Sequence, residues 1–454
     1  MRASTGVVVA GAGPSGLLCA LELARRGIAC RVFDRRPRVP GGGTRCPTVW
    51  QRSREVLERA GVRLEDAEGG FLTLRRKRFH IGGETAAIDV STDRAPFAEP
   101  VLIAQERLER LLTRRLAELG TPVEYATEVV RTADHGWGVT ASVHGPAGEA
   151  GVGAEWLVDT TGRAGPLCSK GSFGFAAERT YPGAEWFLAD VRVADASITT
   201  DEEHIYRFES GHAGLIPIPG RLHRLFLAVG AGTGPTARSA ARRASEVTGL
   251  PIASVEGSTW RVRAHGSVAD RWRSGRIVLA GDAAKRLPMP VHGLNSGLQD
   301  AAALGWMLAD AIRHGDAGLL AEYERERRSA ALALFERTDR VFGYGSRTGI
   351  SELRDRLLKR VVDMRTEPEV RHPAGRLVDG GAGECGLTGG PLPAVALATG
   401  APSLFELVRA TTGWTAVVLC DPADGTGARR ELTLRSALDA EFPGRVRVVQ
   451  APPD

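Results

Sequence analysis

Long apolar runs are missing from this chain, and so is a secretory signal. No hydrophobic stretch approaches the roughly 20 residues that span a bilayer. The N-terminus runs directly into a strand-like segment, residues 7–10, without the charged region, apolar stretch and cleavage site of a signal peptide. These absences argue against helical membrane spans and a membrane partner, and they favour a cytoplasmic protein.

Cysteine is scarce and never occurs in a C-x-x-C spacing. Metal sites built on cysteine usually show such pairs, so no metal site is predicted. In a cytoplasmic chain of this size the thiols are expected to be reduced. The six cysteines are Cys19, Cys30, Cys46, Cys168, Cys385 and Cys420.

Aromatic residues are few where positive charge is dense. Between Arg25 and Arg54 the chain has nine arginines and one acid, Asp34, but only Phe33 and Trp50 as aromatics. Proteins that bind single-stranded nucleic acid combine aromatic and basic residues, so nucleic-acid binding is not predicted. The arginines form either a solvated surface, which we favour for most of them, or a field that attracts anions such as a cofactor diphosphate.

The rest of the composition is that of a soluble globular protein, with 43% hydrophobic and 25% charged residues. A length of 454 residues exceeds one ordinary core, so two or three domains are expected. Helical patterns cover residues 17–24, 52–60, 105–119, 295–312 and from 317 into the 330s. Strands are expected within residues 71–104, in the helix-poor region 187–265, and at 276–280 and 414–420.

A glycine-rich turn, GAGPSG at residues 11–16, lies between a run of valines and an amphipathic helix. In this context Gly11 permits the tight turn, Gly13 lets the backbone approach a diphosphate, and Gly16 lets helix and strand pack closely. The helix N-terminus offers N–H groups and partial positive charge to phosphates. Asp34 ends the next strand, where it would accept hydrogen bonds from a ribose. The turn predicts a dinucleotide without choosing between NAD and FAD.

A second motif follows a buried-type strand and reads GDAAKRLPMPVHGLNSGLQDA over residues 281–301. It resembles the flavoprotein aromatic hydroxylases, the family of para-hydroxybenzoate hydroxylase, and most of all the three-domain members that tailor aromatic polyketides in actinomycetes. Their pattern is Gly-Asp-Ala-Ala-His, a proline and glycine loop, Gly-x-Asn, and a helix with Asp-Ala. The resemblance selects FAD: Asp282 would serve the ribityl chain or diphosphate, and the following helix would point its N-terminus at the flavin pyrimidine.

Smaller matches point to the same family. Thr44-Arg45 and residues 51–57 (QRSREVL) resemble its first arginine motif, which would place Arg45 near the flavin. Gln105 opens a helix, like the family's glutamine that contacts the ribityl chain. Asp159, after the strand-like residues 156–158, resembles the Asp-Ala-Thr-Gly-Arg variant of related epoxidases and halogenases. The Trp-x-Trp-x-Ile-Pro signature of flavin halogenases is missing, which disfavours halogenation.

The resemblance implies an α/β fold. A Rossmann-like FAD-binding domain (residues 1–70, 105–180 and 266–375) would carry an inserted β-sheet-rich substrate domain (71–104 and 181–265). Residues 376–454 would form a small thioredoxin-like C-terminal module, shortened because it stops at Asp454. No separate nicotinamide-binding fold is visible, as is usual in the family.

The activity implied is that of an FAD-dependent monooxygenase in antibiotic biosynthesis. NADPH or NADH would reduce the flavin, and O₂ would form a flavin C4a-hydroperoxide that hydroxylates an aromatic, polyketide-like substrate. Epoxidation, Baeyer–Villiger insertion and oxidative rearrangement remain open, as does a flavin-binding protein without redox turnover. A monomer or a homodimer is expected.

The motif departs from the family at two positions. Lys285 stands where the family usually has His, so it either places positive charge near the flavin or faces water. The loop from Met289 to His292 is shorter and lacks the paired glycines. His80, His204, His212 and His292 are candidate bases, and we single out His292 because the motif sets it beside the flavin. The predicted cofactor-binding residues are Gly11, Gly13, Pro14, Ser15, Gly16, Asp34, Arg35, Arg45, Gln105, Asp159, Gly281, Asp282, Pro288, Gly293, Leu294 and Asn295.

Overall fold

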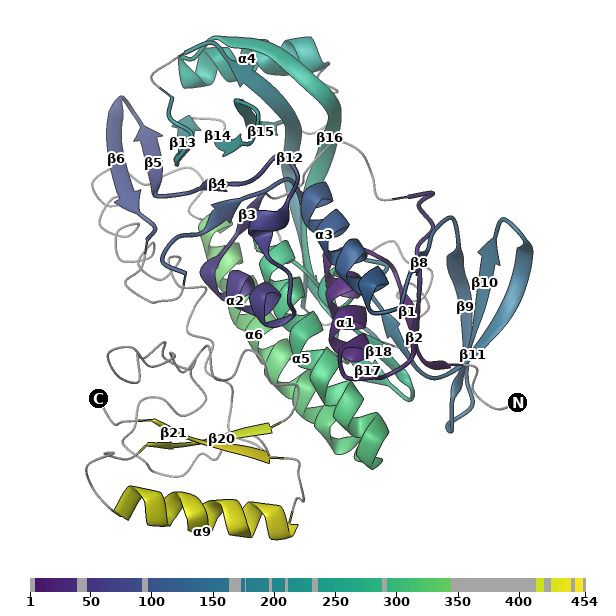
Figure 1. Cartoon of the computed structure of the whole chain (residues 1–454). Coiled ribbons are helices and arrows are strands. Elements are labelled where there is room, and N and C mark those ends of the chain that lie inside the picture. Colours follow the sequence, from purple (N-terminus) through teal and green to yellow (C-terminus); the bar gives the residue numbers. More distant parts are fainter. Residues whose placement is uncertain are drawn as a thin grey trace.

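The computed structural model has a mixed α/β fold, as predicted, with two large sheets and a bundle of long helices (Figure 1). It describes residues 5–38, 47–91, 97–162, 173–175, 177–195, 198–208, 211–230, 236–287, 292–343, 414–419, 426–441 and 446–451.

The first sheet has the strand order β17-β18-β11-β1-β2-β8, in which the neighbouring strands from β18 to β8 are parallel and β17 is antiparallel to β18. Its central strand β1 (Thr5–Ala10) is buried on both faces. Val7 and Val9 pack against the helices, whereas Val8 and Ala10 pack under the hairpin of β9 and β10. The other strands are β2 (Cys30–Phe33), β8 (Val123–Glu124), β9 (Glu128–Asp134), β10 (Val139–Gly145), β11 (Gly148–Asp159), β17 (Arg273–Ser274) and β18 (Ile277–Leu279).

Helices cover one face of this sheet because each has an apolar stripe at helical spacing. In α3 (Gln105–Glu118), for example, Leu108, Leu112 and Leu116 are all buried in the main core. α1 and α5 cross closely, since a side chain at Gly305 would collide with Glu22. The helices are α1 (Pro14–Ala24), α2 (Gln51–Arg59), α5 (Gly293–His314) and α6 (Gly318–Gly343), with a short 3₁₀ turn η1 (Leu64–Asp66).

The second sheet has the order β19-β16-β12-β15-β14-β13-β5-β6. One face packs on α4 (Ala237–Thr248), which lies within the region predicted to be helix-poor. The opposite face carries Trp186 and Phe226 and packs against Trp50. The strands are β5 (Arg76–Ile81), β6 (Glu84–Asp89), β12 (Ala177–Val193), β13 (Glu202–Phe208), β14 (Gly211–Ile218), β15 (Leu222–Val229), β16 (Ile252–Val268) and β19 (Lys285–Arg286).

Two connections join the sheets. The long strand β16 ends beside β19, where Val268 pairs with Lys285 just after the second motif begins. A small three-stranded sheet, formed by β3 (Thr48–Val49), β7 (Val101–Leu102) and β4 (Leu72–Thr73), lies next to Trp50. The second motif therefore stands at the junction of the two large sheets.

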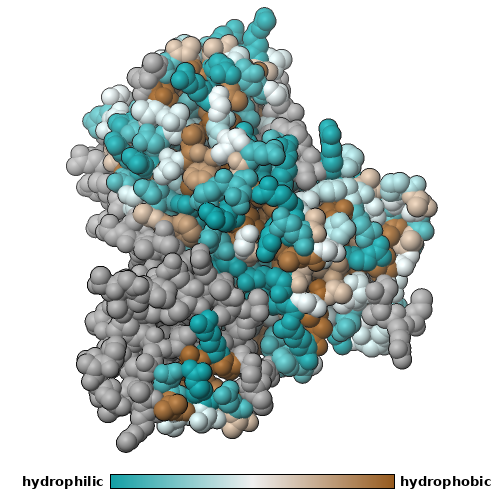
Figure 2. Space-filling view, in the orientation of Figure 1, coloured by the Kyte–Doolittle hydropathy of each residue, from teal (hydrophilic) through white to brown (hydrophobic). Residues whose placement is uncertain are grey.

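Near the C-terminus, β20 (Trp414–Leu419) and β21 (Val446–Ala451) pair in parallel and α9 (Thr426–Glu441) connects them. The strand predicted at residues 414–420 is thus confirmed. No helix in the described part of the chain is long and apolar enough to cross a membrane. On the face drawn in Figure 2, hydrophilic residues predominate and hydrophobic ones are scattered among them.

Candidate functional site

The glycine-rich turn is a sharp reversal between β1 and α1. Gly11 has φ +102°, which favours glycine, and a Cβ there would lie 2.7 Å from the Thr160 carbonyl oxygen. The Thr160 hydroxyl donates to the carbonyls of Ala10 and Gly11, at 2.8 and 2.9 Å. The loop after β11 therefore holds the turn in place.

The first turn of α1 is left open for a ligand. A Cβ at Gly16 would overlap the Gly11 carbonyl oxygen, so the helix packs directly on the turn. A Cβ at Gly13, in contrast, would meet no atom of the described residues within 4 Å. No side chain caps the helix at Gly13, and Pro14 occupies its first position. Its first N–H groups and the positive end of its dipole are thus suited to an anion.

Asp34 follows β2 directly and lies beside this turn. Its carboxylate accepts the Ala12 N–H at 2.7 Å and the Arg36 N–H at 2.8 Å. The Arg36 guanidinium adds two bonds, from Nε at 2.8 Å and from Nη2 at 2.9 Å. Burial alone would raise the pKa of Asp34, but these bonds and the charge of Arg36 outweigh it and hold the pKa below its usual value.

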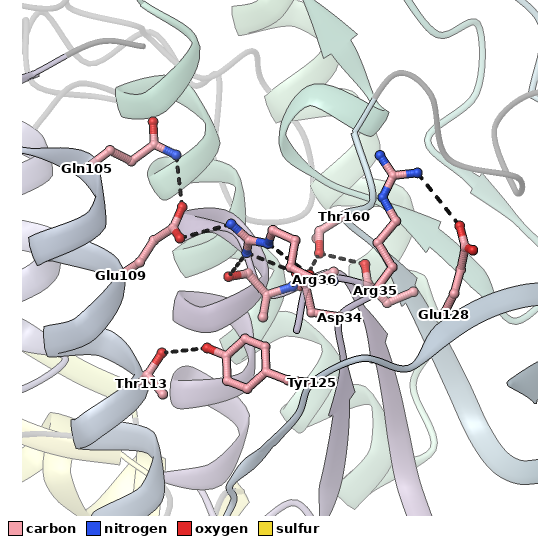
Figure 3. A network of polar contacts seen from close by, with 12 residues as sticks. Asp34, Arg35, Arg36, Gln105, Glu109, Thr113, Tyr125, Glu128 and Thr160 are labelled. Carbon is pink, nitrogen blue, oxygen red and sulfur yellow. Dashed lines mark hydrogen bonds and ion pairs between the residues drawn. The ribbon is translucent and has the colours of Figure 1, made fainter. Parts of the chain in front are cut away.

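Arg36 continues the network to the predicted residue Gln105 (Figure 3). Its Nη1 lies 3.1 Å from Glu109, which is buried and accepts a bond from the Gln105 amide at 2.9 Å. Arg35, the predicted residue, points away instead, toward Glu128 at 3.8 Å, and its side chain is mostly exposed. The sequence interpretation missed Arg36, because the tertiary fold decides which of the two arginines covers Asp34.

Two glycines of the second motif pack directly on the Ser15 side chain of this turn. Gly281 has φ +64°, and a Cβ there would lie 2.6 Å from the Ser15 hydroxyl. A Cβ at Gly297 would collide with the same hydroxyl. The N-termini of α1 and α5 are thereby brought together, as the two motifs require if they share one cofactor.

Asp282 lies in the 3₁₀ turn η2 (Gly281–Ala283) with an exposed side chain. A Cβ at Gly293, the first residue of α5, would be 3.4 Å from its Oδ1. Asp159, at the end of β11, is fully buried and accepts bonds from the backbone and hydroxyl of Thr161, at 2.9 and 2.6 Å. Asp282 therefore stands exposed at the N-terminus of α5, whereas Asp159 shapes the loop behind it.

Asn295 uses its side chain within the protein. It is fully buried, accepts the Trp50 N–H at 2.9 Å and donates to the Thr48 carbonyl at 2.9 Å. No side chain caps α5 at His292, while Leu294 packs at the edge of the core. The contact of the backbone N–H groups of residues 293–295 with a ligand stays a prediction.

The suggestion that Lys285 faces water is wrong. Its side chain is 2% exposed and forms an ion pair with the fully buried Asp300. Burial lowers the pKa of the Lys285 ammonium, and Asp300 opposes that effect. A lysine is rarely buried unless it is paired. The partner of Lys285, Asp300, lies in the following helix α5, so the pairing could not be read from neighbouring residues.

Three of the four candidate histidines lie in the second sheet. His80 Nε2 and His204 Nδ1 are 3.0 Å apart, and both rings stack with Tyr206. Tyr206 belongs to the core under α4, so this group lies on the face opposite Trp186 and Phe226. His212 instead packs edge-on against Trp186, at 4.1 Å between ring centres. His80 and His204 are thus set apart from the second motif.

His292 is the residue just before α5. Its Nδ1 is buried and has no hydrogen-bond partner among the described residues. Burial, reinforced by the charges of Lys77 and Arg337, lowers its pKa to about 3, so the ring is neutral near pH 7.

Arg45, Pro288 and the loop from Met289 to Val291 lie outside the described residues.

These observations fit FAD. The open space at Gly13 and the uncapped α1 N-terminus suit a diphosphate, and Asp34 lies where an adenosine ribose would follow. The exposed Asp282 and the second uncapped helix, α5, suit the ribityl chain and an electron-accepting ring. The groups suited to the cofactor thus lie in two places, at the N-terminus of α1 for the adenosine end and at the N-terminus of α5 for the flavin end, as an extended dinucleotide requires.

Comparison with known proteins agrees with this geometry. A family described as FAD binding domain matches residues 4–338, which is most of the chain. The 6-methylpretetramide 4-monooxygenase of Streptomyces rimosus is 32% identical over 71% of this chain, which spans 58% of that relative. The dialkyldecalin synthase of Streptomyces rugosporus is 30% identical and matches 93% of this chain and 89% of its own.

A solved structure, the anhydrotetracycline hydroxylase OxyS from Streptomyces rimosus, superposes with a TM-score of 0.76 at 26% identity, covering 98% of this chain and 90% of that one. The predicted resemblance to the flavoprotein aromatic hydroxylases is therefore confirmed. With a family match over most of its length and this geometry at both motifs, the chain belongs to the FAD-binding domain family.

Proposed function

We propose that this protein is an FAD-dependent monooxygenase that uses NADPH or NADH and O₂ to hydroxylate an aromatic, polycyclic small molecule. The observation that carries the proposal is the meeting of two uncapped helix N-termini, α1 and α5, at one turn with open space at Gly13. The relative named 6-methylpretetramide 4-monooxygenase supports the reaction class.

Each end of the site has its own task. The first turn of α1, residues 13–16, binds the diphosphate, and Asp34 with Arg36 behind it holds the adenosine ribose. Asp282 binds the ribityl chain. The N–H groups of residues 293–295 face the flavin ring and stabilise negative charge there. Gln105, Arg35, Arg45, Asp159 and Pro288 are assigned to the same cofactor from the sequence motifs alone.

The bound cofactor supplies the redox chemistry, so the chain has to orient the substrate and exclude water. The face of the second sheet with Trp186 and Phe226 suits a flat aromatic molecule. Phe226 lies over Gly214, where a Cβ would overlap its ring. We assign residues 71–104 and 181–265 to this substrate domain, and residues 1–70, 105–180 and 266–375 to the FAD domain.

His292 is assigned to the flavin edge or to the substrate. Its neutral ring and its buried Nδ1, which has no partner within the described part of the chain, allow it to exchange a hydrogen bond with either of them. Residues 376–454 are assigned to a thioredoxin-like module, supported by the strand–helix–strand unit of β20, α9 and β21.

The test begins with the purified, FAD-loaded protein mixed with NADPH or NADH without oxygen. Bleaching of the flavin absorption, alone or with candidate polycyclic aromatics, is expected. Admission of ¹⁸O₂ should then give a product with one labelled oxygen atom. A flavin that stays oxidised with both nucleotides and every candidate substrate would refute the monooxygenase.

A second candidate is an FAD-containing synthase that never turns its flavin over. The specific observation is the dialkyldecalin synthase, which matches 93% of this chain, whereas the monooxygenase relative matches 71%. This alternative predicts tight FAD binding, no bleaching, and ring formation from a polyene substrate under argon. Oxygen-independent product formation would favour it over the first.

A further inference from the structure

Lys285 is a buried cation at the junction of the two sheets. Its backbone belongs to β19 and pairs with Val268 at the end of β16. Its ammonium forms an ion pair with Asp300 of α5 and lies 5.2 Å from the centre of the Trp272 ring. One residue thus connects the substrate sheet to the helix whose N-terminus faces the proposed flavin site.

The two carboxylate oxygens of Asp300 bind different elements, helix α6 and the turn at Gly281. Oδ1 accepts the Arg327 Nε of α6 at 2.8 Å. Oδ2 takes Lys285 and also the Gly281 N–H, at 3.3 Å. All three side chains are 5% exposed or less. Oδ2 therefore binds the turn that presents Asp282, and Oδ1 binds helix α6.

The two cations are not equivalent in this arrangement. With Lys285 absent, the Arg327 guanidinium could take both oxygens of Asp300, because its fork matches a carboxylate. The Gly281 N–H would then lose its acceptor, and the turn would be free to shift. With Arg327 absent, Lys285 and the Gly281 N–H would both remain on Oδ2.

We propose that Lys285 is a positioning residue of the cofactor site: it holds Asp300 Oδ2 on the Gly281 N–H and so fixes Asp282 against the N-terminus of α5. This proposal rests on the placement of FAD at that turn. It assigns to Lys285 an effect on cofactor binding that exceeds its effect on the stability of the apoprotein.

The experiment compares Lys285→Met with Arg327→Met. Each removes one buried cation and leaves Asp300 paired with the other, so the two variants are matched in charge and burial. FAD is stripped, and its rebinding is followed by the loss of flavin fluorescence. Thermal unfolding of both apoproteins is measured in parallel. If Lys285→Met does not fold, Lys285→Gln takes its place, because it keeps an N–H donor without the charge.

Lys285→Met should weaken FAD binding about tenfold or more, the equivalent of one charge-assisted hydrogen bond. Arg327→Met should weaken it less than about threefold, even when its apoprotein loses as much thermal stability. Equal losses of FAD affinity that track apoprotein stability, or unchanged FAD binding in the Lys285 variant, would overturn the proposal. A wild-type chain that binds no FAD would instead refute the proposed function.

Discussion

Asn295 on α5 and Trp50 before α2 are joined by a buried hydrogen bond of 2.9 Å from the Trp50 N–H to the Asn295 Oδ1. The same amide donates to the carbonyl of Thr48, so one side chain bonds a backbone carbonyl of β3 and the backbone N–H of the residue that precedes α2. Residues 245 positions apart in the chain are thereby fixed at the flavin end of the proposed site.

Asn295→Asp should destabilise the protein by roughly 2–4 kcal/mol. The carboxylate can still accept the Trp50 N–H but cannot donate to Thr48, and it is buried against a carbonyl oxygen. Denaturant unfolding of the apoprotein measures the effect. A loss of stability below about 0.5 kcal/mol would show that the two hydrogen bonds of the Asn295 amide contribute little to stability.

Gly13→Ala should weaken FAD binding with little effect on apoprotein stability, whereas Gly16→Ala should destabilise the fold itself. The new methyl group at residue 13 enters open space, so the apoprotein should unfold within a few degrees of wild type, while FAD binding falls by at least about tenfold. The methyl group at residue 16 overlaps the Gly11 carbonyl oxygen and should prevent folding or lower stability by several kcal/mol. A Gly13→Ala protein that binds FAD normally would place the diphosphate elsewhere.

Asp34→Asn should discriminate between two cofactors. It removes the charge that Arg36 and the Ala12 N–H surround at the adenosine end. FAD affinity should fall about tenfold, as expected for a hydrogen bond involving a charged group. Riboflavin monophosphate lacks the adenosine, so its affinity should stay within about twofold of wild type. Equal losses for both would mean that Asp34 acts through the fold instead of through the ribose.

His223→Leu should increase stability and flatten its dependence on pH. Both ring nitrogens of His223 are buried without a partner among the described residues, and burial lowers its pKa from 6.5 to about 4. Between these values the unfolded chain takes up a proton that the folded chain refuses, so stability falls as pH drops from 6.5 to 4. The leucine variant should gain about 1–2 kcal/mol at pH 7 and lose less on acidification.

Urea unfolding at pH 7.5 and pH 5 would measure both effects, with His135→Gln as the control because that side chain is exposed. Parallel pH profiles for His223→Leu and wild type would show that His223 takes up its proton at the same pH in the folded and unfolded states, which would contradict the lowered pKa.

Local patterns in the sequence were sufficient for the elements that bear the cofactor motifs. The valines of β1, the glycines of the turn and the apolar stripe of α1 act over short distances, and the helix expected at residues 295–312 extends over Gly293–His314. α4 was missed because its face toward the sheet consists of alanines, such as Ala240 and Ala244, which give little periodic signal. Its N-cap Thr236 and the left-handed Gly249 could have revealed it.

Long-range pairings lay beyond local patterns. The choice of Arg36 over Arg35 depends on Glu109, a residue of a helix 73 positions away. The burial of Lys285 depends on two helices that the chain has not yet reached at that point. The stacking of His80 with His204 depends on the parallel pairing of β5 and β13. Each case needs the tertiary fold, because a charged or aromatic side chain alone does not reveal which partner it will meet.

The single strand β16 has a mechanical consequence. It is hydrogen-bonded along most of its length to β12 in the second sheet, and its last residues hold β19 directly behind the Gly281 turn. The sheet assigned to the substrate and the turn that presents Asp282 therefore share one backbone support.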